Sequence, residues 1–422
     1  METVLLKNID NPKSADIDEY LKAGGYRGLS KAVTLEPADI IEEVSKSGLK
    51  GRGGAGFPTA MKWRFAATDP KFPKYLICNA DEGEPGTFKD RPILEKNPHL
   101  LLEGMAISAI ALGSEQGYIY LRGEYPDARD ILEASIRQAN DRGYLGDDIL
   151  GKGLTFNIHV HQGAGAYICG EETALIESIE GKRGQPRSKP PFPVNQGAWE
   201  MPTIVNNVET LANIPYIIEI GGDAYSGIGS EDCPGPKLFC VSGSVNRPGV
   251  YELPMGTSLR EIIHDHAGGI KNGRTLKAVI PGGLSTPVLP AESIDCRMDF
   301  ISMQGVGSML GSGAVIVMDD SICMVSVTYR AMKFFEHESC GKCVPCREGT
   351  DWLRKVLERV ENGKGREGDV DLLLYISGTM TGRTFCPLGD GAAGVVQAMI
   401  KHFRTEFEEH ISEKKCTYKS IN

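Results

Sequence analysis

Four of the eleven cysteines are spaced in a way that restricts how this chain can fold. Cys340, Cys343 and Cys346 follow the pattern Cys-x2-Cys-x2-Cys, and Cys386 stands further along, directly before a proline. A tight turn can direct three thiolates at one cubane, and a remote cysteine then completes it. Structural zinc more often uses two separated Cys-x2-Cys pairs, so zinc and free thiols remain the weaker alternatives. The spacing therefore predicts that the four thiols converge on an iron–sulfur cluster, [4Fe–4S].

The other seven cysteines are scattered, and most are expected to be buried thiols that act as small apolar side chains. They are Cys78, Cys169, Cys233, Cys240, Cys296, Cys323 and Cys416. Lys342 and Arg347 flank the clustered cysteines. Their cations either offset part of the cluster's negative charge or simply face solvent.

Charge and hydropathy exclude several functional classes. A net charge of −10 over 422 residues makes nucleic-acid binding a poor expectation, because phosphate neutralisation needs a basic surface. No apolar run approaches the roughly 20 residues that span a bilayer, and the N-terminus has no apolar segment typical of a signal peptide. We expect a cytoplasmic protein without direct membrane insertion, and in that compartment its cysteines are not expected to form a disulfide framework.

Periodicity predicts an α/β multidomain chain. Strands are expected at 74–78, 117–121 and 155–161, alternating with helices that include 98–112, and this alternation is typical of a layered α/β domain. The predicted parts are a helical segment with the first glycine-rich loop (1–70), a Rossmann-like but non-classical α/β domain (71–235), a ββαβ unit that resembles a ubiquitin-like β-grasp (236–325) and a C-terminal four-helix bundle carrying the cysteines (326–422).

The first glycine-rich loop, 51–56, contains G-x-G-x-x-G. A Rossmann fingerprint follows a strand, whereas the residues before this loop have helical periodicity, so an ordinary Rossmann site is rejected. The loop can still approach a phosphate or a flat ring closely, with Arg52 and Lys62 as nearby cations. A merely flexible loop is the alternative.

An acidic loop, 79–86, follows the strand that ends at Cys78. Its three carboxylates would repel a phosphate but suit ribose or ribityl hydroxyls. They would also reject a 2′-phosphate, which favours NAD over NADP. The alternative is a solvated acidic turn.

A third glycine-rich loop, 163–172, lies between a predicted strand and a predicted helix. Its acids could be ligands, or could simply stabilise the helix N-terminus. The basic loop 182–189 could meet a pyrophosphate while Phe192 stacks on a ring. Asn206 and Asn207 are expected to start another helix, as cap or ligand. No nucleophile triad is evident, and His159 and His161 are not expected to bind metal.

Together these motifs carry a resemblance to a known family. The segments 51–59, 78–86, 165–173 and 338–349 resemble, in the same order, the NADH-binding flavoprotein subunit of respiratory complex I. The resemblance implies FMN, NADH and one [4Fe–4S] cluster. A flavin is the cofactor that converts hydride transfer into single-electron transfer.

The resemblance also implies ligands by position. Those expected for FMN are Gly51, Arg52, Gly53, Lys62, Asn79, Asp81, Gly83, Tyr167, Gly170, Glu171, Glu172, Asn206, Asn207 and Thr210. Those expected for NADH are Phe57, Phe65, Phe192, Glu84 and Lys189. Hydride would pass directly from nicotinamide to flavin, so no catalytic side chain is expected.

The partners implied are a thioredoxin-like [2Fe–2S] subunit and a large multi-cluster subunit, with the chain peripheral on the inner face of the cell membrane. The length of the chain favours a separate complex I subunit. The diaphorase of an NAD-reducing hydrogenase or an NAD-dependent formate dehydrogenase is the second hypothesis. A non-enzymatic electron-transfer subunit with an empty flavin site is the third.

Overall fold

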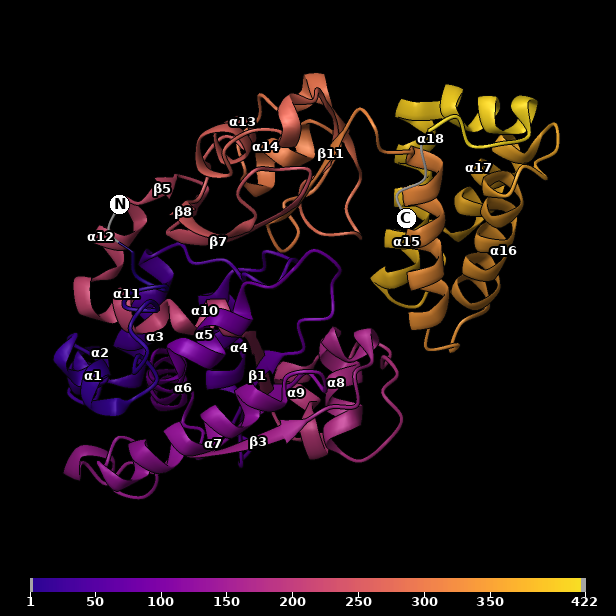
Figure 1. Cartoon of the computed structure of the whole chain (residues 1–422). Helices are drawn as coiled ribbons and strands as arrows, with labels where there is room; N and C mark the ends of the chain where they lie inside the picture. Colours follow the sequence, from indigo (N-terminus) through magenta and orange to yellow (C-terminus); the bar gives the residue numbers. More distant parts are fainter. Residues whose placement is uncertain (1–2, 419–422) are drawn as a thin grey trace. The chain divides into compact units, whose positions relative to one another are not determined.

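The computed structural model describes residues 3–418, which form two compact units (Figure 1). The first unit contains the chain up to Gly83, together with Phe88–Phe239 and Val250–Thr257. The second contains Glu84–Thr87, Cys240–Gly249 and the chain from Ser258 onward. Among the described residues, no helix is both long and apolar enough to cross a membrane.

The first unit is built on a fully parallel four-stranded sheet in the order β3-β2-β1-β4. Its strands are β1 (Tyr75–Ala80), β2 (Gln116–Leu121), β3 (Asn157–Gln162) and β4 (Thr203–Asn207). The chain runs outward from β1 to β3 and then returns to place β4 on the other side of β1. This reversal creates a topological switch point between β1 and β4, where open α/β sheets bind ligands at the carboxyl ends of their strands.

The sequence predicted a helix at 98–112, and helix α6 (Pro98–Leu112) has these bounds. Proline occupies the first turn and Gly113 ends the helix with φ +66°, so both ends carry local signals. Every residue of α6 except Ile110 is buried. Its one internal carboxylate, on Glu103, accepts hydrogen bonds from the Tyr20 hydroxyl (2.5 Å) and the Leu29 amide (2.9 Å), which tie the N-terminal helices to the core.

The remaining helices of this unit surround the sheet. They are α1 (Ile17–Lys22), α2 (Arg27–Ala32), α3 (Pro37–Lys46), α4 (Thr59–Thr68), α5 (Asp90–Lys96), α7 (Pro126–Asp141), α8 (Glu172–Ile179), α9 (Pro193–Gln196), α10 (Val208–Ala212), α11 (Ile214–Ile220) and α12 (Gly222–Ser226). Helix α11 packs on α2 and α3, which lie far away in the sequence (Figure 1).

A second sheet has five strands in the order β10-β9-β11-β7-β8. They are β7 (Pro236–Gly243), β8 (Gly249–Pro254), β9 (Leu276–Ile280), β10 (Leu289–Pro290) and β11 (Ala314–Asp319). Strand β11 is parallel to β7 and antiparallel to β9. The Ser258 hydroxyl accepts from the Glu261 amide and caps the start of α13 (Leu259–Glu261). Strand β10 and helix α14 (Phe300–Gly305) were not predicted.

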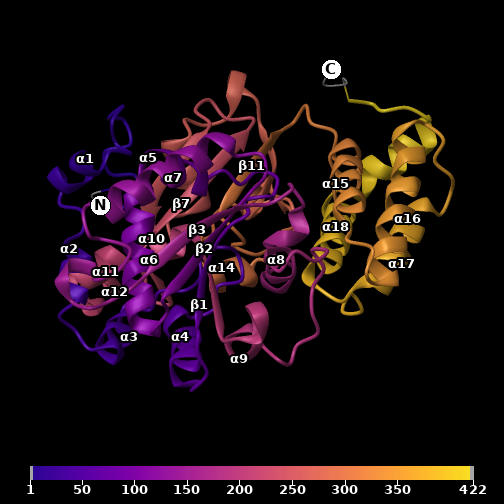
Figure 2. The same cartoon turned by 90° about the horizontal axis from the view of Figure 1, so that it is seen from below.

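Four helices form the C-terminal bundle, as the periodicity predicted. They are α15 (Met324–Glu338), α16 (Val344–Glu361), α17 (Asp369–Met380) and α18 (Pro387–Glu413), and they run side by side in both views (Figures 1 and 2). Buried Phe335, Leu353, Leu373 and Phe407 come from the four helices in turn.

Strand β4 was not predicted, and Asn206 and Asn207 end it. The helix that was expected to start at these residues follows directly as α10. Asn207 does cap the following helix, because its side chain accepts from the Glu209 amide at 3.0 Å. The strand was missed because its apolar part, 203–205, is too short to show a period.

Candidate functional site

The first glycine-rich loop lies against the switch point of the parallel sheet. Helix α3 precedes this loop, whereas an ordinary Rossmann loop follows a strand, so the rejection of an ordinary Rossmann site is confirmed. The Arg52 amide donates to the Thr210 hydroxyl at 2.8 Å, which attaches the loop to the start of α10. A Cβ on Gly53 would lie 3.2 Å from the Cβ of Asn207, closer than most real contacts. Glycine at 53 therefore lets the loop approach the end of β4 closely.

The acidic loop and the third glycine-rich loop meet at the same edge. Asn79 of β1 pairs in register with Asn207 of β4, and its side-chain amide donates to the Gly170 carbonyl at 2.8 Å. A Cβ on Gly83 would lie 3.1 Å from the Tyr167 ring. Position 83 therefore has no room for a side chain, and the two loops pack closely against each other.

The Arg52 side chain does not face this edge. Its guanidinium is buried and donates to the Cys233 sulfur (3.2 Å) and the Pro234 carbonyl (2.6 Å). Only the backbone of Arg52 is thus presented with the glycine-rich loop. The direction of the Arg52 side chain could not be predicted from the sequence, because an arginine in a glycine-rich loop can point either toward a ligand or into the core.

Lys62 and Lys189 are joined through one carboxylate. Glu172 accepts from Lys62 at 2.7 Å and from Lys189 at 2.8 Å, and Lys62 also donates to the Val205 carbonyl at 2.9 Å. Burial opposes ionisation of Glu172, but the two ammonium groups outweigh it and lower its pKa to about 2. Glu172 thereby holds both predicted cofactor-binding lysines in place beside the sheet.

Glu171 has a structural task at the same helix start. Its carboxylate accepts from the Thr173 and Ala174 amides at 2.9 and 3.0 Å, which makes it the N-cap of α8, and it also pairs with Lys189 at 3.1 Å. This is the capping role that the sequence left open as the alternative to ligand binding.

The aromatic residues expected to stack on NADH lie at the surface. Phe57, Phe65 and Phe192 are each about half exposed. Glu84, expected to bind the adenosine ribose, is in the second unit, where its carboxylate accepts from the Ser285 amide at 2.6 Å.

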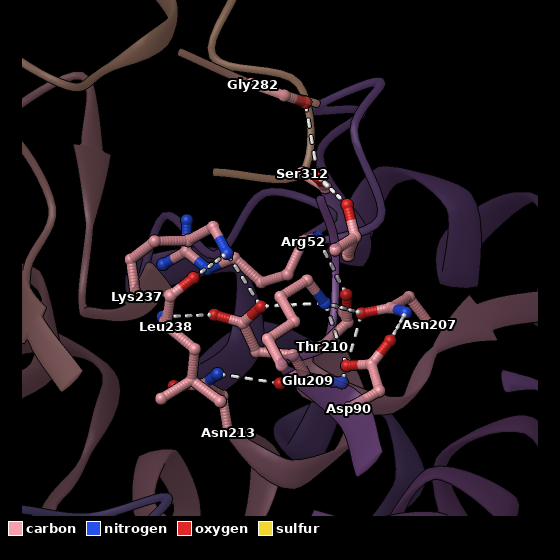
Figure 3. A network of polar contacts seen from close by, with 12 residues as sticks. Arg52, Asp90, Asn207, Glu209, Thr210, Asn213, Lys237, Leu238, Gly282 and Ser312 are labelled. Atoms are coloured by element: carbon pink, nitrogen blue, oxygen red, sulfur yellow. Dashed lines mark hydrogen bonds and ion pairs between the residues drawn. The ribbon is translucent and has the colours of Figure 1, made fainter. Parts of the chain in front are cut away.

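A buried charge network beneath the switch point was missed by sequence reasoning (Figure 3). The fully buried Lys89 ammonium contacts Asp90 (2.8 Å), Glu209 (2.9 Å) and the Asn207 side-chain oxygen (3.2 Å). Asn207 in turn donates to Asp90 at 2.7 Å, and Lys237 pairs with Glu209 at 2.8 Å. Burial opposes ionisation of Glu209, yet Lys237 and then Lys89 lower its pKa. The network fixes the orientation of Asn207, one of the predicted ligands.

The clustered cysteines lie at the ends of bundle helices. Cys340 follows α15, Cys343 is the N-cap of α16, Cys346 lies in its first turn, and Cys386 is the N-cap of α18. Helix N-termini carry partial positive charge and stabilise thiolates. Three of the four thiols are therefore placed where an anionic cluster is favoured.

Hydrogen-bond donors reach two of these sulfurs. The Phe385 amide donates to the Cys343 sulfur at 3.4 Å, and the Ser339 hydroxyl lies 3.3 Å from the Cys346 sulfur. Burial raises the pKa of the Cys346 thiol to about 11, against the lowering effect of Ser339. Donors to ligand sulfurs are typical of iron–sulfur sites, so the residues present fit a cluster.

The flanking cations both have packing roles. The Lys342 ammonium lies 4.3 Å from the centre of the Phe385 ring, and Arg347 donates to the Gly341 carbonyl at 3.0 Å and pairs with Glu348. These contacts keep both positive charges beside the cysteines.

Three family models match this chain. Residues 44–216 match the Nuo51 FMN-binding domain, residues 237–317 match the SLBB domain, and residues 326–410 match the NADH-ubiquinone oxidoreductase-F iron-sulfur binding region. The FMN-binding match contains the parallel sheet and its three loops, and the iron–sulfur match contains all four clustered cysteines.

Full-length relatives agree with these matches. An NADH-quinone oxidoreductase subunit of Rhizobium meliloti is 56% identical, with 99% of each chain covered. Its counterpart in Streptomyces coelicolor is 48% identical over 97% of this chain and 91% of its own. A solved NAD⁺-reducing [NiFe]-hydrogenase chain is 38% identical with a TM-score of 0.85, covering 97% of this chain and 67% of that one. This chain therefore belongs to the family of NADH-quinone oxidoreductase subunits that combine an FMN-binding domain with a 4Fe–4S region.

Proposed function

We propose that this chain is the electron-input subunit of an NADH-quinone oxidoreductase, which oxidises NADH and delivers electrons to partner subunits. The observation that carries the proposal is the presence, in one chain, of a sheet edge lined by glycine-rich loops and a set of four cysteines at helix ends. When bound, FMN would supply the chemistry that links a two-electron hydride donor to a one-electron acceptor such as a [4Fe–4S] cluster. The family membership supports both cofactors.

The sheet edge is proposed as the FMN site. Glycines at 51, 53, 83 and 170 would bring backbone against the cofactor, and Asn79 and Asn207 are already held by hydrogen bonds within the protein. Lys62 and Lys189 would offer cations to phosphate groups, oriented by Glu172. The remaining residues proposed are Arg52 through its backbone, Asp81, Tyr167, Glu171, Asn206 and Thr210.

NADH is proposed to stack on the flavin held there. Phe57, Phe65 and Phe192 offer exposed rings for stacking, and Glu84 would accept from ribose hydroxyls and exclude a 2′-phosphate. Stacked rings at roughly 3–3.5 Å are what direct hydride transfer needs, so these residues act by positioning alone.

Electrons are proposed to leave through Cys340, Cys343, Cys346 and Cys386. A thioredoxin-like [2Fe–2S] subunit and a multi-cluster subunit are the proposed partners, with the assembly on the inner face of the membrane. We also propose four functional parts at 1–70, 71–235, 236–325 and 326–422.

A hydrogenase diaphorase is the second candidate, and the 38% identity to the NAD⁺-reducing [NiFe]-hydrogenase chain favours keeping it. The higher identities to NADH-quinone oxidoreductase subunits favour the first. Proteins that co-purify with the native chain separate the two: quinone-linked iron–sulfur subunits support the first, and a nickel-containing subunit supports the second.

The function is tested by an anaerobic visible spectrum before and after NADH, repeated with NADPH. We expect flavin bleaching with NADH and little with NADPH, and Glu84→Gln should weaken this preference. Equal rates with the two nucleotides would exclude the role given to the acidic loop. Protein that holds no FMN after gentle anaerobic preparation would support a non-enzymatic subunit instead.

A further inference from the structure

Two of the scattered cysteines meet a histidine in the C-terminal bundle. Among the described residues, the Cys323 and Cys416 sulfurs and a ring nitrogen of His410 all lie within 4.8 Å of one another. The Cys323 sulfur is 3.3 Å from His410 Nε2. Tetrahedral Zn²⁺, with bonds of about 2.3 Å to sulfur and 2.0–2.1 Å to nitrogen, would separate a sulfur and a nitrogen ligand by about 3.5 Å. The three side chains are thus nearly at ligand spacing.

The His410 ring is held in the tautomer that a metal needs. Its Nδ1 lies 2.7 Å from the Glu406 carbonyl, one turn earlier in α18, and must donate its proton there. Nε2 then carries the lone pair and points at Cys323. A ring nitrogen fixed by a backbone carbonyl is the usual outer-shell arrangement of metal-binding histidines. His410 is also fully buried, so water does not compete for Nε2.

The three residues come from separate segments. Cys323 is the N-cap of α15, His410 lies in the last turns of α18, and Cys416 lies in the segment that follows α18. The N-terminus of α15 favours a thiolate at Cys323, where the Ser326 amide already donates to the sulfur at 3.4 Å. Only tertiary structure brings these residues together.

We propose that Cys323, His410 and Cys416 bind one Zn²⁺ ion, and that this ion fastens the C-terminal segment to the bundle. Two thiols and one neutral imidazole are ligands that zinc prefers, and the thiols lose their protons on binding. This site is separate from the four cysteines assigned to the iron–sulfur cluster.

The segment that the ion would fasten already packs locally. The Lys277 ammonium lies 4.0 Å from the centre of the Tyr418 ring and pairs with Glu406 at 2.5 Å. The Lys277–Glu406 pair is mostly buried but joins Lys277 to α18, so of these two contacts only the one with the Tyr418 ring attaches the segment, and the metal would add a second attachment at Cys416.

The test measures zinc and iron by mass spectrometry in the full-length protein, purified from zinc-supplemented cells. We expect about one zinc per chain in the wild type. Cys416→Ala and His410→Ala should each lower zinc at least tenfold and leave iron and FMN unchanged. Cys296→Ala removes a buried cysteine outside the site and should keep zinc, which makes it the matched control.

Zinc K-edge X-ray absorption then identifies the ligands. Two sulfurs at about 2.3 Å with nitrogen or oxygen near 2.0–2.1 Å would support the site, whereas four sulfurs would mean zinc in the iron–sulfur cysteines. Absence of zinc from wild type, equal zinc in the variants, or a Cys323–Cys416 disulfide found by peptide mapping would each overturn the proposal. If Cys416→Ala loses zinc but proteolysis of the C-terminal segment is no faster than in Cys296→Ala, the fastening role is wrong.

Discussion

Glu172→Gln tests the ion-pair geometry of the candidate FMN site. The substitution keeps the shape of the side chain but removes the charge that holds Lys62 and Lys189. The Glu172 pKa lies near 2 instead of the ordinary 4.5, and at about 1.4 kcal/mol per pH unit this difference corresponds to about 3 kcal/mol of stabilisation. The side chain is 26% exposed, so solvent screening makes this an upper value.

The pH dependence follows from the direction of the shift. Because the folded pKa is depressed, the stabilisation is fully present above about pH 4.5 and is lost as the pH falls through about 2. The difference between wild type and Glu172→Gln should therefore be constant from pH 6 to 8. A carboxyl that still titrated in this range would instead give a difference that shrinks toward pH 6.

Native-state hydrogen exchange of β4 is the assay, because Lys62 donates to the Val205 carbonyl within that strand. A loss of about 3 kcal/mol corresponds to roughly 100-fold faster exchange of its amides. The control is Glu95→Gln, which removes an exposed i,i+4 pair with Arg91 and should change exchange less than about threefold. Equal exchange in the two variants would refute the structural role of Glu172.

Three further predictions concern the other parts of the site. Gly53→Ala should lower FMN content without changing iron content, because its Cβ would lie 3.2 Å from Asn207; unchanged flavin occupancy in purified protein would contradict this. Glu209→Gln should destabilise the first unit by about 3–5 kcal/mol in urea unfolding, since it leaves two buried lysines underpaired, and a change below about 1 kcal/mol would count against the network. Ser339→Ala should make the cluster's reduction potential more negative by removing the hydroxyl beside Cys346, and an unchanged potential in a redox titration followed by electron paramagnetic resonance would exclude this contact.

The sequence predicted correctly those features that depend on interactions between residues close together in the chain. Both ends of helix α6 were located correctly, because its apolar run, the proline at its start and the glycine at its end are all readable within one segment. The bundle helices were found for the same reason. The spacing of Cys340, Cys343 and Cys346 likewise constrained a turn, and the structure places two of them at the start of α16.

Contacts between segments that are far apart in the sequence could not be predicted from these local signals. Strand β4 pairs with β1 across more than a hundred residues, and its short apolar stretch carries no period of its own. The direction of the Arg52 guanidinium depends on where Cys233 and Pro234 arrive, and Lys89 is neutralised by Asp90 next to it together with Glu209 far along the chain.

The glycine-rich loops, the three thiols that share a turn and the long helices such as α6 could be established from the order of the residues, because these features depend on neighbours within a few positions. Which charges are buried together, and that Cys323, His410 and Cys416 meet, became visible only in the folded chain. These residues are far apart in the sequence, and the contacts between them form only when the chain folds. The free energy that favours such contacts comes from the packing of the whole core.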